Sequence, residues 1–525
     1  MTIHLPVLRG GGGAVVPLWH RSLTCGCGSG AAETAQRAVL PSPEIARRAV
    51  PPDKGKDKCG VFGVWGGPEA ARLAYLAMYA QQHRGQESAG LALTDGKEIF
   101  GHTGMGLVPE VFDADRLERL ERRPGLGAIG HTRYSTTGGS LACNAQPLIE
   151  SFLGGQVAIA HNGNLVNAEA MRRRFEEAGH LFQTTSDTEV IMHILASPAQ
   201  QRAVDPLAET LRHLQGAFAL VFLFKDRIEA ARDPWGWRPL VLGRMDDGRP
   251  VVASETVALN VLGAEVIREI EPGEIVTLDD SGVASRRFAS PASKLALCAF
   301  EHVYFANPAS TLFGQNVQEV REALGERLAA EAPVEADFVM PMPDSGRSAA
   351  AGYARASGIP YREGIVPNRY VGRTFIKPTQ GERHAAVRLK LNVIRELVEG
   401  RRLVVVDDSI VRGTTTRVKM QHIYDAGAKE VHLRISCPPI RHPCFFGIDF
   451  ATREQLIANG RTVEDIRQFL GVDSLHFLSL DGVLSTMTRN GQDYCTACWS
   501  GEYPIDVEHP VTEDVIEGRQ MRMFQ

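Results

Sequence analysis

The stretch Leu403–Arg417, which reads LVVVDDSIVRGTTTR, decides the fold of the second half of the chain. Its apolar, Val-rich beginning predicts a buried strand that ends at Asp407 and Asp408. A short loop then leads into a helical pattern. Two carboxylates at the end of a buried strand, beside a helix N-terminus, suit a sugar phosphate. They can accept hydrogen bonds from ribose hydroxyls or help hold Mg²⁺.

The loop itself has the composition of a phosphate site. Its amides and the hydroxyls of Thr414–Thr416 can surround a phosphate, and Gly413 allows the backbone to approach closely. The alternative is an ordinary strand–turn–helix with an Asp cap. Two acids, a Gly and a Thr run in one strand–loop–helix frame favour the phosphate site.

The run VVVDDSIVRGTTT resembles the phosphoribosyl pyrophosphate (PRPP) loop of type I phosphoribosyltransferases. Its residues are most similar to those of the amidophosphoribosyltransferase family. The resemblance implies an α/β transferase domain over residues 291–500. It also implies that the two acids hold the ribose and its metal while the following loop holds the 5-phosphate. The PRPP-binding residues implied are Asp407, Asp408, Ser409, Arg412, Gly413, Thr414, Thr415 and Thr416.

Size and composition limit the other possibilities. A chain of 525 residues with 44% hydrophobic content can bury two or three domain cores. A formal net charge of −5 argues against a general nucleic-acid or membrane-surface binder, and no apolar run has the length of a membrane span. Nine scattered Cys indicate thiol or metal chemistry in a reducing compartment, so we expect a cytoplasmic protein.

Residues 1–58 differ in composition from the remainder. They contain Gly10–Gly13, Cys25, Cys27 and the charged run 53–58, and they predict a disordered leader that is removed. An organelle transit peptide and a start codon assigned too early are the alternatives. A metal site at the two Cys is less favoured than a disordered tail.

The pattern over residues 59–290 predicts stacked sheets with helices outside, because strands occur in runs with few helices between them. The helices expected are 68–82, one ending near Ala178, and 187–196. The strands expected are 58–65, 89–93, 127–132, 157–160, 217–224, 239–242, 251–254 and 274–278.

Five motifs in this half resemble the N-terminal-nucleophile glutaminases in family order. They are CGVFG at 59–63, HRGQESAG at 83–90, HTRYSTTG at 131–138, HNGNL at 161–165 and TSDTE at 185–189. The resemblance implies a four-layer αββα glutamine amidotransferase domain over 59–290.

The chemistry of a glutaminase explains these residues. If the leader is removed, Cys59 gains a free α-amine with a pKa of about 7.7–8.0, so one residue can supply nucleophile and base. Asn162 and the N–H of Gly163 would stabilise the oxyanion. The resemblance also implies that Arg133 binds the α-carboxylate of glutamine and Asp187 its α-ammonium. Taken alone, Cys59 would be a buried strand thiol.

Tyr134 has two interpretations. The resemblance implies that it senses PRPP and tightens the glutamine site, whereas the simpler alternative is an aromatic packed at a strand end.

A second anion loop is predicted in the transferase half. The strand 336–341 is followed by PDSGRS at 343–348 and an Ala-rich helix at 349–356. A capping turn is the alternative. The resemblance makes this the pyrophosphate loop, with Ser345 joining Asp407 and Asp408 around one Mg²⁺. Residues 368–392 read as a surface loop, and the family uses them as a lid. Its cations would be Arg369, Arg373 and Lys377.

A group of four cysteines forms a third candidate site. The CxxC pair Cys495 and Cys498 puts two thiols on one turn, and Cys298 and Cys444 could complete a tetrahedral set. Zn²⁺ and an iron–sulfur cluster both remain possible from the residues, with a free redox CxxC as a further alternative. The positions match the ligands of the cluster-bearing branch of the family, which implies [4Fe–4S] with a structural role.

The other expectations are less specific. Cys143 and Cys437 are predicted to be core thiols, and residues 501–525 a C-terminal helical segment. The family resemblance implies that ammonia from glutamine passes to PRPP, giving 5-phosphoribosylamine, glutamate and pyrophosphate at the start of purine synthesis. It also implies a homotetramer inhibited by purine nucleotides. The competing functions are a hexosamine-6-phosphate synthase, which should lack the DDS…GTTT loop, and a PRPP or nucleotide sensor, which would not need Cys59.

Overall fold

The computed structural model describes residues 59–123, 125–134, 140–368, 391–448, 452–489 and 491–507. The predictions for the leader and the lid cations lie outside these residues, as do residues 508–525 of the predicted C-terminal helical segment. Its described part, 501–507, forms no helix, so that part of the prediction is wrong. Within the described residues, no helix combines the length and the apolar character that crossing a membrane requires.

Two antiparallel sheets form the first half. The first has the strand order β11-β9-β10-β1-β4-β2-β3 and the second β13-β12-β8-β7-β6-β5. The strands of the first sheet are β1 (Gly60–Trp65), β2 (Ser88–Thr94), β3 (Ile99–Met105), β4 (Gly127–Arg133), β9 (Val241–Arg244), β10 (Pro250–Ala253) and β11 (Glu265–Glu269). Those of the second are β5 (Leu148–Phe152), β6 (Gly155–Leu165), β7 (Gly216–Leu223), β8 (Ile228–Arg232), β12 (Glu274–Asp279) and β13 (Gly282–Arg287).

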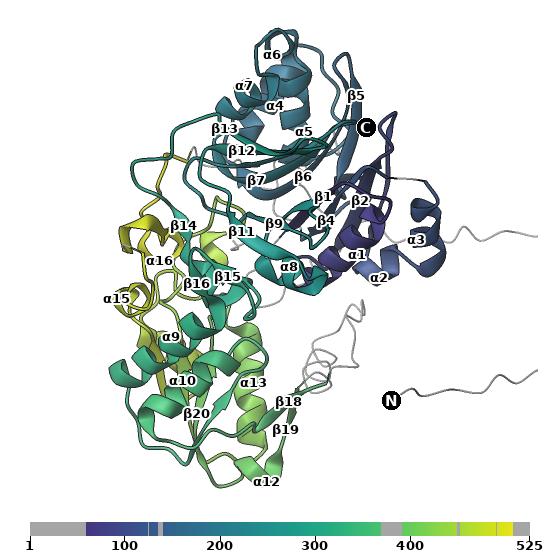
Figure 1. Cartoon of the computed structure of the whole chain (residues 1–525). Coiled ribbons are helices and arrows are strands. Elements are labelled where there is room, and N and C mark those ends of the chain that lie inside the picture. Colours follow the sequence, from purple (N-terminus) through teal and green to yellow (C-terminus); the bar gives the residue numbers. More distant parts are fainter. Residues whose placement is uncertain are drawn as a thin grey trace, which may run out of the picture. The chain divides into compact units, whose positions relative to one another are not determined.

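Alternating side chains divide each sheet between two cores. Val61 of β1 packs between the sheets with Val221 of β7, whereas its neighbour Phe62 packs under the helices on the other face. Both faces are therefore buried. Helices cover the outer faces of both sheets (Figure 1), which confirms the predicted four layers. These helices are α1 (Ala70–Ala80), α2 (Val108–Val111), α3 (Ala114–Glu121), α4 (Ala168–Glu177), α5 (Asp187–Ala196), α6 (Pro198–Gln201), α7 (Pro206–Arg212) and α8 (Thr256–Leu262).

Most of the predicted elements in this half are confirmed within a few residues. Two differ in a way that matters. HNGNL continues strand β6 instead of following it, because the strand pairs with β7 as far as Leu165. The strand predicted at 239–242 begins at Val241, after a Pro that has no N–H to donate to a ladder.

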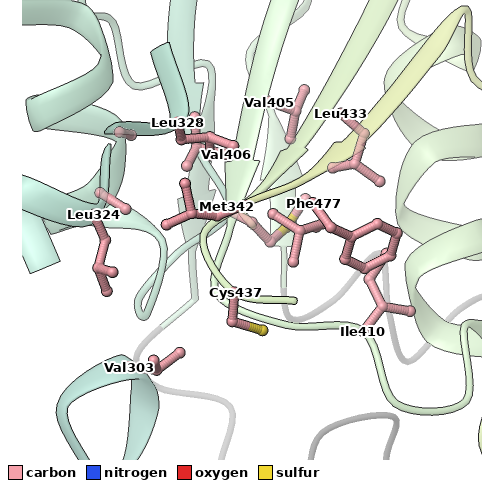
Figure 2. Packing of buried hydrophobic residues seen from close by; sticks show 14 of the residues in the cluster. Val303, Leu324, Leu328, Met342, Val405, Val406, Ile410, Leu433, Cys437 and Phe477 are labelled. Atoms are coloured by element: carbon pink, nitrogen blue, oxygen red, sulfur yellow. The ribbon is translucent and has the colours of Figure 1, made fainter. Parts of the chain in front are cut away.

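A parallel sheet in the order β17-β20-β21-β22 forms the centre of the second half. Its apolar runs are continuous because helices cover both faces. Figure 2 shows Val405, Val406 and Leu433 packed with Met342 and Phe477 in this core. The strands are β17 (Phe338–Pro341), β20 (Arg402–Asp407), β21 (Glu430–Ile435) and β22 (Ser474–Phe477), and the helices are α9 (Val317–Glu331), α10 (Arg347–Ser357), α13 (Thr414–Asp425) and α14 (Val463–Leu470).

Short elements complete this half. The strand β23 (Tyr494–Cys495) runs parallel to β14 (Leu297–Cys298), so the end of the described chain returns to the start of the transferase half. A turn of π-helix, Glu301–Phe305, follows β14. The remaining elements are β15 (Thr311–Leu312), β16 (Gln315–Asn316), β18 (Ile365–Pro367), β19 (Leu391–Val393), α12 (Arg395–Val398), α15 (Leu480–Leu484), α16 (Ala497–Ser500) and 3₁₀ turns at Gln82–Arg84, Ala142–Asn144, Arg453–Gln455 and Gly491–Asp493.

Candidate functional site

The candidate nucleophile, Cys59, immediately precedes β1. Its side chain is buried, and Sγ lies 3.8 Å from the carbonyl oxygen of Tyr134. Its own carbonyl oxygen accepts a hydrogen bond of 2.9 Å from Nε of Arg84. Burial raises the pKa of the Cys59 thiol, and the neighbouring Arg133 and Arg84 only partly oppose this effect. A thiol in this setting needs a base before it can attack.

The candidate oxyanion residues lie on the neighbouring sheet. Asn162 and Gly163 are in β6, opposite Ala219 and Phe218 of β7. The side-chain nitrogen Nδ2 of Asn162 is buried and has no hydrogen-bond partner among the described residues. A buried donor of this kind is normally paired, so it is suited to a group that arrives with a ligand.

Gly163 meets a strict requirement for a small residue. A Cβ atom at this position would lie 2.0 Å from the carbonyl oxygen of Ala217 on β7. Only Gly allows the two strands to approach this closely.

One hydrogen bond ties the two halves of this site together. His131 on β4 and His161 on β6 belong to different sheets, and Nε2 of His131 lies 3.0 Å from the carbonyl oxygen of His161. Burial lowers the pKa of His131 to about 3, so its ring is neutral at physiological pH and Nε2 can carry the donated hydrogen.

Arg133 and Asp187, the predicted glutamine-binding pair, are both buried. Arg133 ends β4, and its Nη1 donates to Oε1 of Glu87 at 2.8 Å. Asp187 begins α5, where Oδ2 accepts from the N–H of Leu165 at 3.0 Å. Burial would raise the pKa of Asp187, but His161, the Leu165 amide and Arg133 together hold it below its ordinary value. The carboxylate is therefore ionised, as recognition of an ammonium group requires.

The strand β20 lies inside the parallel sheet and carries the predicted PRPP acids at its carboxyl end. Asp407 and Asp408 are almost fully buried, and Oδ1 of Asp407 accepts from the N–H of Asp408 at 3.0 Å. The hydroxyl of Ser409 donates to Asp408. Gly413 has φ +76°, and α13 begins directly after it with Thr414. The predicted strand, loop and helix are thus confirmed as a structure.

The second anion loop lies directly against the first. The N–H of Met342, just after β17, donates to the carbonyl oxygen of Val406 at 2.7 Å. A Cβ atom at Gly346 would lie 2.3 Å from that same oxygen. Because Val406 precedes Asp407, the loop that carries Ser345 is packed beside the paired acids. Among the described residues, however, no group of three or more His, Cys, Asp or Glu side chains is arranged to hold one metal ion.

Two other parts of the predicted PRPP site, Arg412 and the lid, have less direct support. Arg412 donates from Nε and Nη2 to Oε1 of Gln455 at 3.0 and 2.9 Å. The hairpin β18–β19 brackets the predicted lid, whose cations Arg369, Arg373 and Lys377 lie outside the described residues.

The four predicted cluster ligands line one cavity together with Trp237 and Phe446, whose rings stack at 4.4 Å. Cys298 and Cys495 are opposite each other in the parallel pair β14–β23, and Cys498 follows in α16. Cys444 comes from the loop after β21. The four cysteines therefore line one space, although no three of them are recognised as a metal site in the described part of the chain.

The environment of these thiols matters for metal binding. Burial raises the pKa of all four, that of Cys495 to about 11. The N–H of Phe446 donates to Sγ of Cys444 at 3.4 Å, and the buried Arg238 opposes the rise at Cys298 and Cys444. Backbone amides and a cation directed at sulfur favour the thiolates that a metal group requires.

Comparisons with known proteins agree with this geometry. A family model described as a glutamine amidotransferase domain matches residues 131–261. The amidophosphoribosyltransferase of Bacillus subtilis is 47% identical over 456 residues, which cover 86% of this chain and 95% of the relative. The chloroplastic amidophosphoribosyltransferase of Glycine max is 48% identical, over 87% of this chain and 79% of the relative. The chain belongs to the amidophosphoribosyltransferase family.

Solved structures of the family have the same fold. One is described as the allosteric regulatory enzyme of purine biosynthesis, with a TM-score of 0.80 and 46% identity over 86% of this chain and 98% of the other. Another is the B. subtilis glutamine PRPP amidotransferase complexed with ADP and GMP, with a TM-score of 0.79 and 45% identity over 86% of this chain and 99% of the other.

Family membership decides between the competing functions. The chain catalyses the first committed step of purine biosynthesis, using glutamine and PRPP. Neither a hexosamine-6-phosphate synthase nor a sensor without activity fits these relatives.

One prediction about cysteine is wrong. Cys143 was expected in a core, but it is exposed in the 3₁₀ turn Ala142–Asn144, whose buried member is Asn144. Cys437 is fully buried, as predicted.

A group of buried charges that contacts the backbone of Cys59 was not predicted. Arg84, Arg238, Glu255 and Glu301 are all 0–1% exposed and are linked by ion pairs. Arg84 occurs in the HRGQESAG motif, but in a sequence the others cannot be distinguished from surface charges.

Proposed function

We propose that Cys59 attacks the side-chain amide of glutamine and that the ammonia released is used at the Asp407–Thr416 loop. The observation that carries the assignment is Nδ2 of Asn162 on β6, which is buried and has no hydrogen-bond partner among the described residues. It supplies a donor for the oxyanion that forms when a thiolate adds to the amide carbon.

The hydrolysis requires the leader to be absent. The α-amine of Cys59 takes the thiol proton, and sulfur forms a bond to the amide carbon. As that intermediate collapses, the proton passes to the departing nitrogen, which leaves as NH₃. Water then cleaves the thioester to give glutamate. Arg133 would hold the α-carboxylate of the substrate and Asp187 its α-ammonium, which the ionised state of Asp187 supports.

At the second site, NH₃ displaces pyrophosphate from C1 of PRPP and forms 5-phosphoribosylamine. Asp407 and Asp408 would hold the ribose hydroxyls, and the loop from Ser409 to Thr416 the 5-phosphate. With Ser345 they would also hold one Mg²⁺, which neutralises diphosphate charge when bound. The contact of Gly346 with Val406 supports this grouping. In water NH₃ would be protonated to ammonium, so we propose that it passes between the two sites through an apolar passage.

The four cysteines are the site proposed for a cluster. They line one cavity and come from the paired strands β14 and β23, a loop and the short helix α16. Cys298, Cys444, Cys495 and Cys498 would hold [4Fe–4S], which when bound would join the segment ending in α16 to the transferase half. A stabilising role of this kind needs no redox step.

Regulation and assembly follow by analogy with the family. The solved B. subtilis relative is complexed with ADP and GMP, so we propose that purine nucleotides inhibit this chain as well. We further propose a homotetramer. The relatives include chloroplastic and bacterial proteins, and we propose the cytoplasm as the compartment, with residues 1–58 as the segment that would change it.

The test uses purified protein whose N-terminus has been sequenced. Glutamate release should depend on a free Cys59 and rise with PRPP, and pyrophosphate should form in equal amount. Release without pyrophosphate, or full activity with residues still ahead of Cys59, would contradict the mechanism. Iron and acid-labile sulfide near four each per chain support the cluster, whereas stoichiometric zinc refutes it.

A further inference from the structure

Glu301 binds two arginines that come from the other half of the chain. Its Oε1 accepts from Nη2 of Arg84 at 2.9 Å and from Nη1 of Arg238 at 3.0 Å, and its Oε2 accepts from Nη1 of Arg84 at 3.1 Å. All three side chains are at most 2% exposed. Glu301 begins the π-turn of the transferase half, whereas Arg84 and Arg238 belong to the glutaminase half.

The first arginine leads to the nucleophile. Nε of Arg84 donates to the carbonyl oxygen of Cys59 at 2.9 Å. Within the described ranges, the other partner of its guanidinium is Glu255, and all three nitrogens of the Arg84 side chain donate a hydrogen bond. Because the contacted atom is the backbone of Cys59 itself, the position of Arg84 fixes the position of both the thiol and the α-amine.

The second arginine leads to the oxyanion strand. Nη2 of Arg238 donates to the carbonyl oxygen of Phe446 at 2.8 Å. The preceding residue, Phe445, accepts from Nδ2 of Asn164 at 2.9 Å. A Cβ atom at Gly447 would lie 3.0 Å from the carbonyl carbon of Gly163. The segment that Arg238 holds is thus packed against the strand that carries Asn162 and Gly163.

The transferase half holds Glu301 in place from the other side. Arg321 on α9 donates from Nε to the carbonyl oxygen of His302 at 2.7 Å and from Nη2 to that of Ala306 at 2.8 Å. Burial lowers the pKa of Arg321 to about 10, and the charge of Asp408 opposes this decrease. The guanidinium therefore stays charged at neutral pH. The π-turn is fixed to α9, and Glu301 with it.

Stability alone does not explain such an arrangement. Burial would raise the pKa of Glu301, but Arg84 and Arg238 hold it below its ordinary value, so the carboxylate is ionised. Buried ions lose their hydration, and well-packed apolar side chains often stabilise a protein equally well. A carboxylate that accepts directional hydrogen bonds from two arginines fixes their relative positions. Apolar packing fixes positions less strictly.

We propose that Glu301 is a positioning residue for the glutaminase reaction, through which the transferase half fixes both the Cys59 backbone and the support of the oxyanion strand. The inference rests on the proposed function of Cys59, Asn162 and Gly163. Glu301 contacts none of the reacting atoms and acts through Arg84 and Arg238.

The test compares Glu301→Gln with the matched variant Glu229→Gln. Glu229 on β8 is also a buried carboxylate between two arginines, Arg227 and Arg286, but it contacts no residue of either site in the described part of the chain. Three quantities are measured for each full-length, processed protein: glutamine hydrolysis with saturating PRPP, phosphoribosylamine formation from PRPP and ammonium, and the melting temperature.

For Glu301→Gln we expect kcat for glutamine hydrolysis to fall about 10-fold or more, in line with losses from small misplacements of catalytic groups. KM for glutamine and the ammonium-dependent rate should stay within about twofold, since Arg133, Asp187 and the PRPP loops are not touched. The rate at which a glutamine-like diazoketone alkylates Cys59 should fall with kcat. Glu229→Gln should change none of these rates.

Each other outcome overturns the inference. A wild-type kcat in Glu301→Gln shows that the contacts do not position the site. Equal losses of the ammonium-dependent and glutamine-dependent rates show a general structural role. If Glu301→Gln does not fold, Glu301→Asp replaces it, because the shorter carboxylate keeps its charge but cannot reach both arginines, and the same separation of rates is required. Failure of the proposed function is distinguishable, because wild-type protein would then release no glutamate at Cys59.

Discussion

The glutaminase site and the PRPP site are built in opposite ways. Cys59, Arg133, Asn162 and Asp187 come from segments far apart in the sequence and meet because two sheets stack and one pair of His residues links them. One continuous segment, Asp407–Asp425, instead contains the PRPP acids, the phosphate loop and the helix N-terminus. It lies at the carboxyl end of one strand of the parallel sheet.

The two sites also differ in how their polar groups are satisfied. Asn162 has a buried donor with no partner in the described part of the chain, and the surroundings of Asp187 keep its carboxylate ionised. The PRPP acids are hydrogen-bonded within their own loop, through the N–H of Asp408 and the hydroxyl of Ser409. The first site is therefore preorganised for charge that develops during reaction, whereas the second must exchange its internal hydrogen bonds for those of a ligand.

The largest expected effect separates the two sites completely. Cys59→Ala should abolish glutamine-dependent synthesis, with a loss of at least about 10⁴-fold, because no thioester can form. Synthesis from ammonium should be unchanged, since the PRPP site is intact. Both rates are measured as pyrophosphate release.

Cys143→Ala is the control for this experiment, because Cys143 is an exposed thiol in the same half of the chain. The comparison would be wrong if Cys59→Ala also lost ammonium-dependent synthesis, or if the control lost glutamine use.

The second effect tests the preorganised donor. Asn162→Ala should lower kcat for glutamine hydrolysis by about 10²–10³-fold with little change in KM, as for other oxyanion donors. The reason is that the oxyanion exists only after attack has begun. Steady-state kinetics of glutamate release measure both constants. Asn260→Ala, at an exposed position of α8, should have no effect. A rise in KM alone would make Asn162 a substrate-binding group instead.

The third effect concerns the PRPP acids. Asp408→Asn should lower synthesis from both glutamine and ammonium, by about 10–100-fold, because one charge-assisted hydrogen-bonding group is lost. PRPP titrations of both reactions give the change. Asp481→Asn, at an exposed position of α15, is the control. A loss confined to the glutamine reaction would contradict the assignment of Asp408 to PRPP.

The contrast between the sites explains what the sequence could predict. The segment from Leu403 to Thr416 contains strand, loop and helix in order, so its structure follows from local pattern alone. The glutaminase site has no such local signal, and its residues were found only through their resemblance to a family. Stacked sheets were predictable from runs of strands, but not which strand of one sheet lies over which strand of the other.

Buried charge is the feature that local sequence hides best. Glu and Arg are usually found at the surface, so nothing in the local sequence indicates that Glu301 and Arg238 are buried. They lose contact with water only because the two halves of the chain pack together. Cys143 shows the opposite error. Its residue type predicts a buried position, but it lies exposed in a 3₁₀ turn. In both cases burial depends on contacts distant in sequence, which periodicity does not report.

The smallest effect tests the backbone of the phosphate loop. Gly413 has φ +76°, and an added Cβ atom would lie 2.2 Å from Cδ1 of Ile457, which is the end of a flexible side chain. Gly413→Ala should therefore lower the free energy of unfolding by about 1–2 kcal/mol, from left-handed strain and repacking. It should also raise KM for PRPP a few-fold, because the strained loop amides are those that face the phosphate.

Gly400→Ala is the matched control, since Gly400 has φ +71° just before β20 but no atom within 4 Å of the added Cβ. Denaturant unfolding and PRPP titration of both variants separate backbone strain, which they share, from distortion of the loop. If Gly400→Ala raised KM for PRPP as much as Gly413→Ala, the effect would come from the β20 register and not from the phosphate loop.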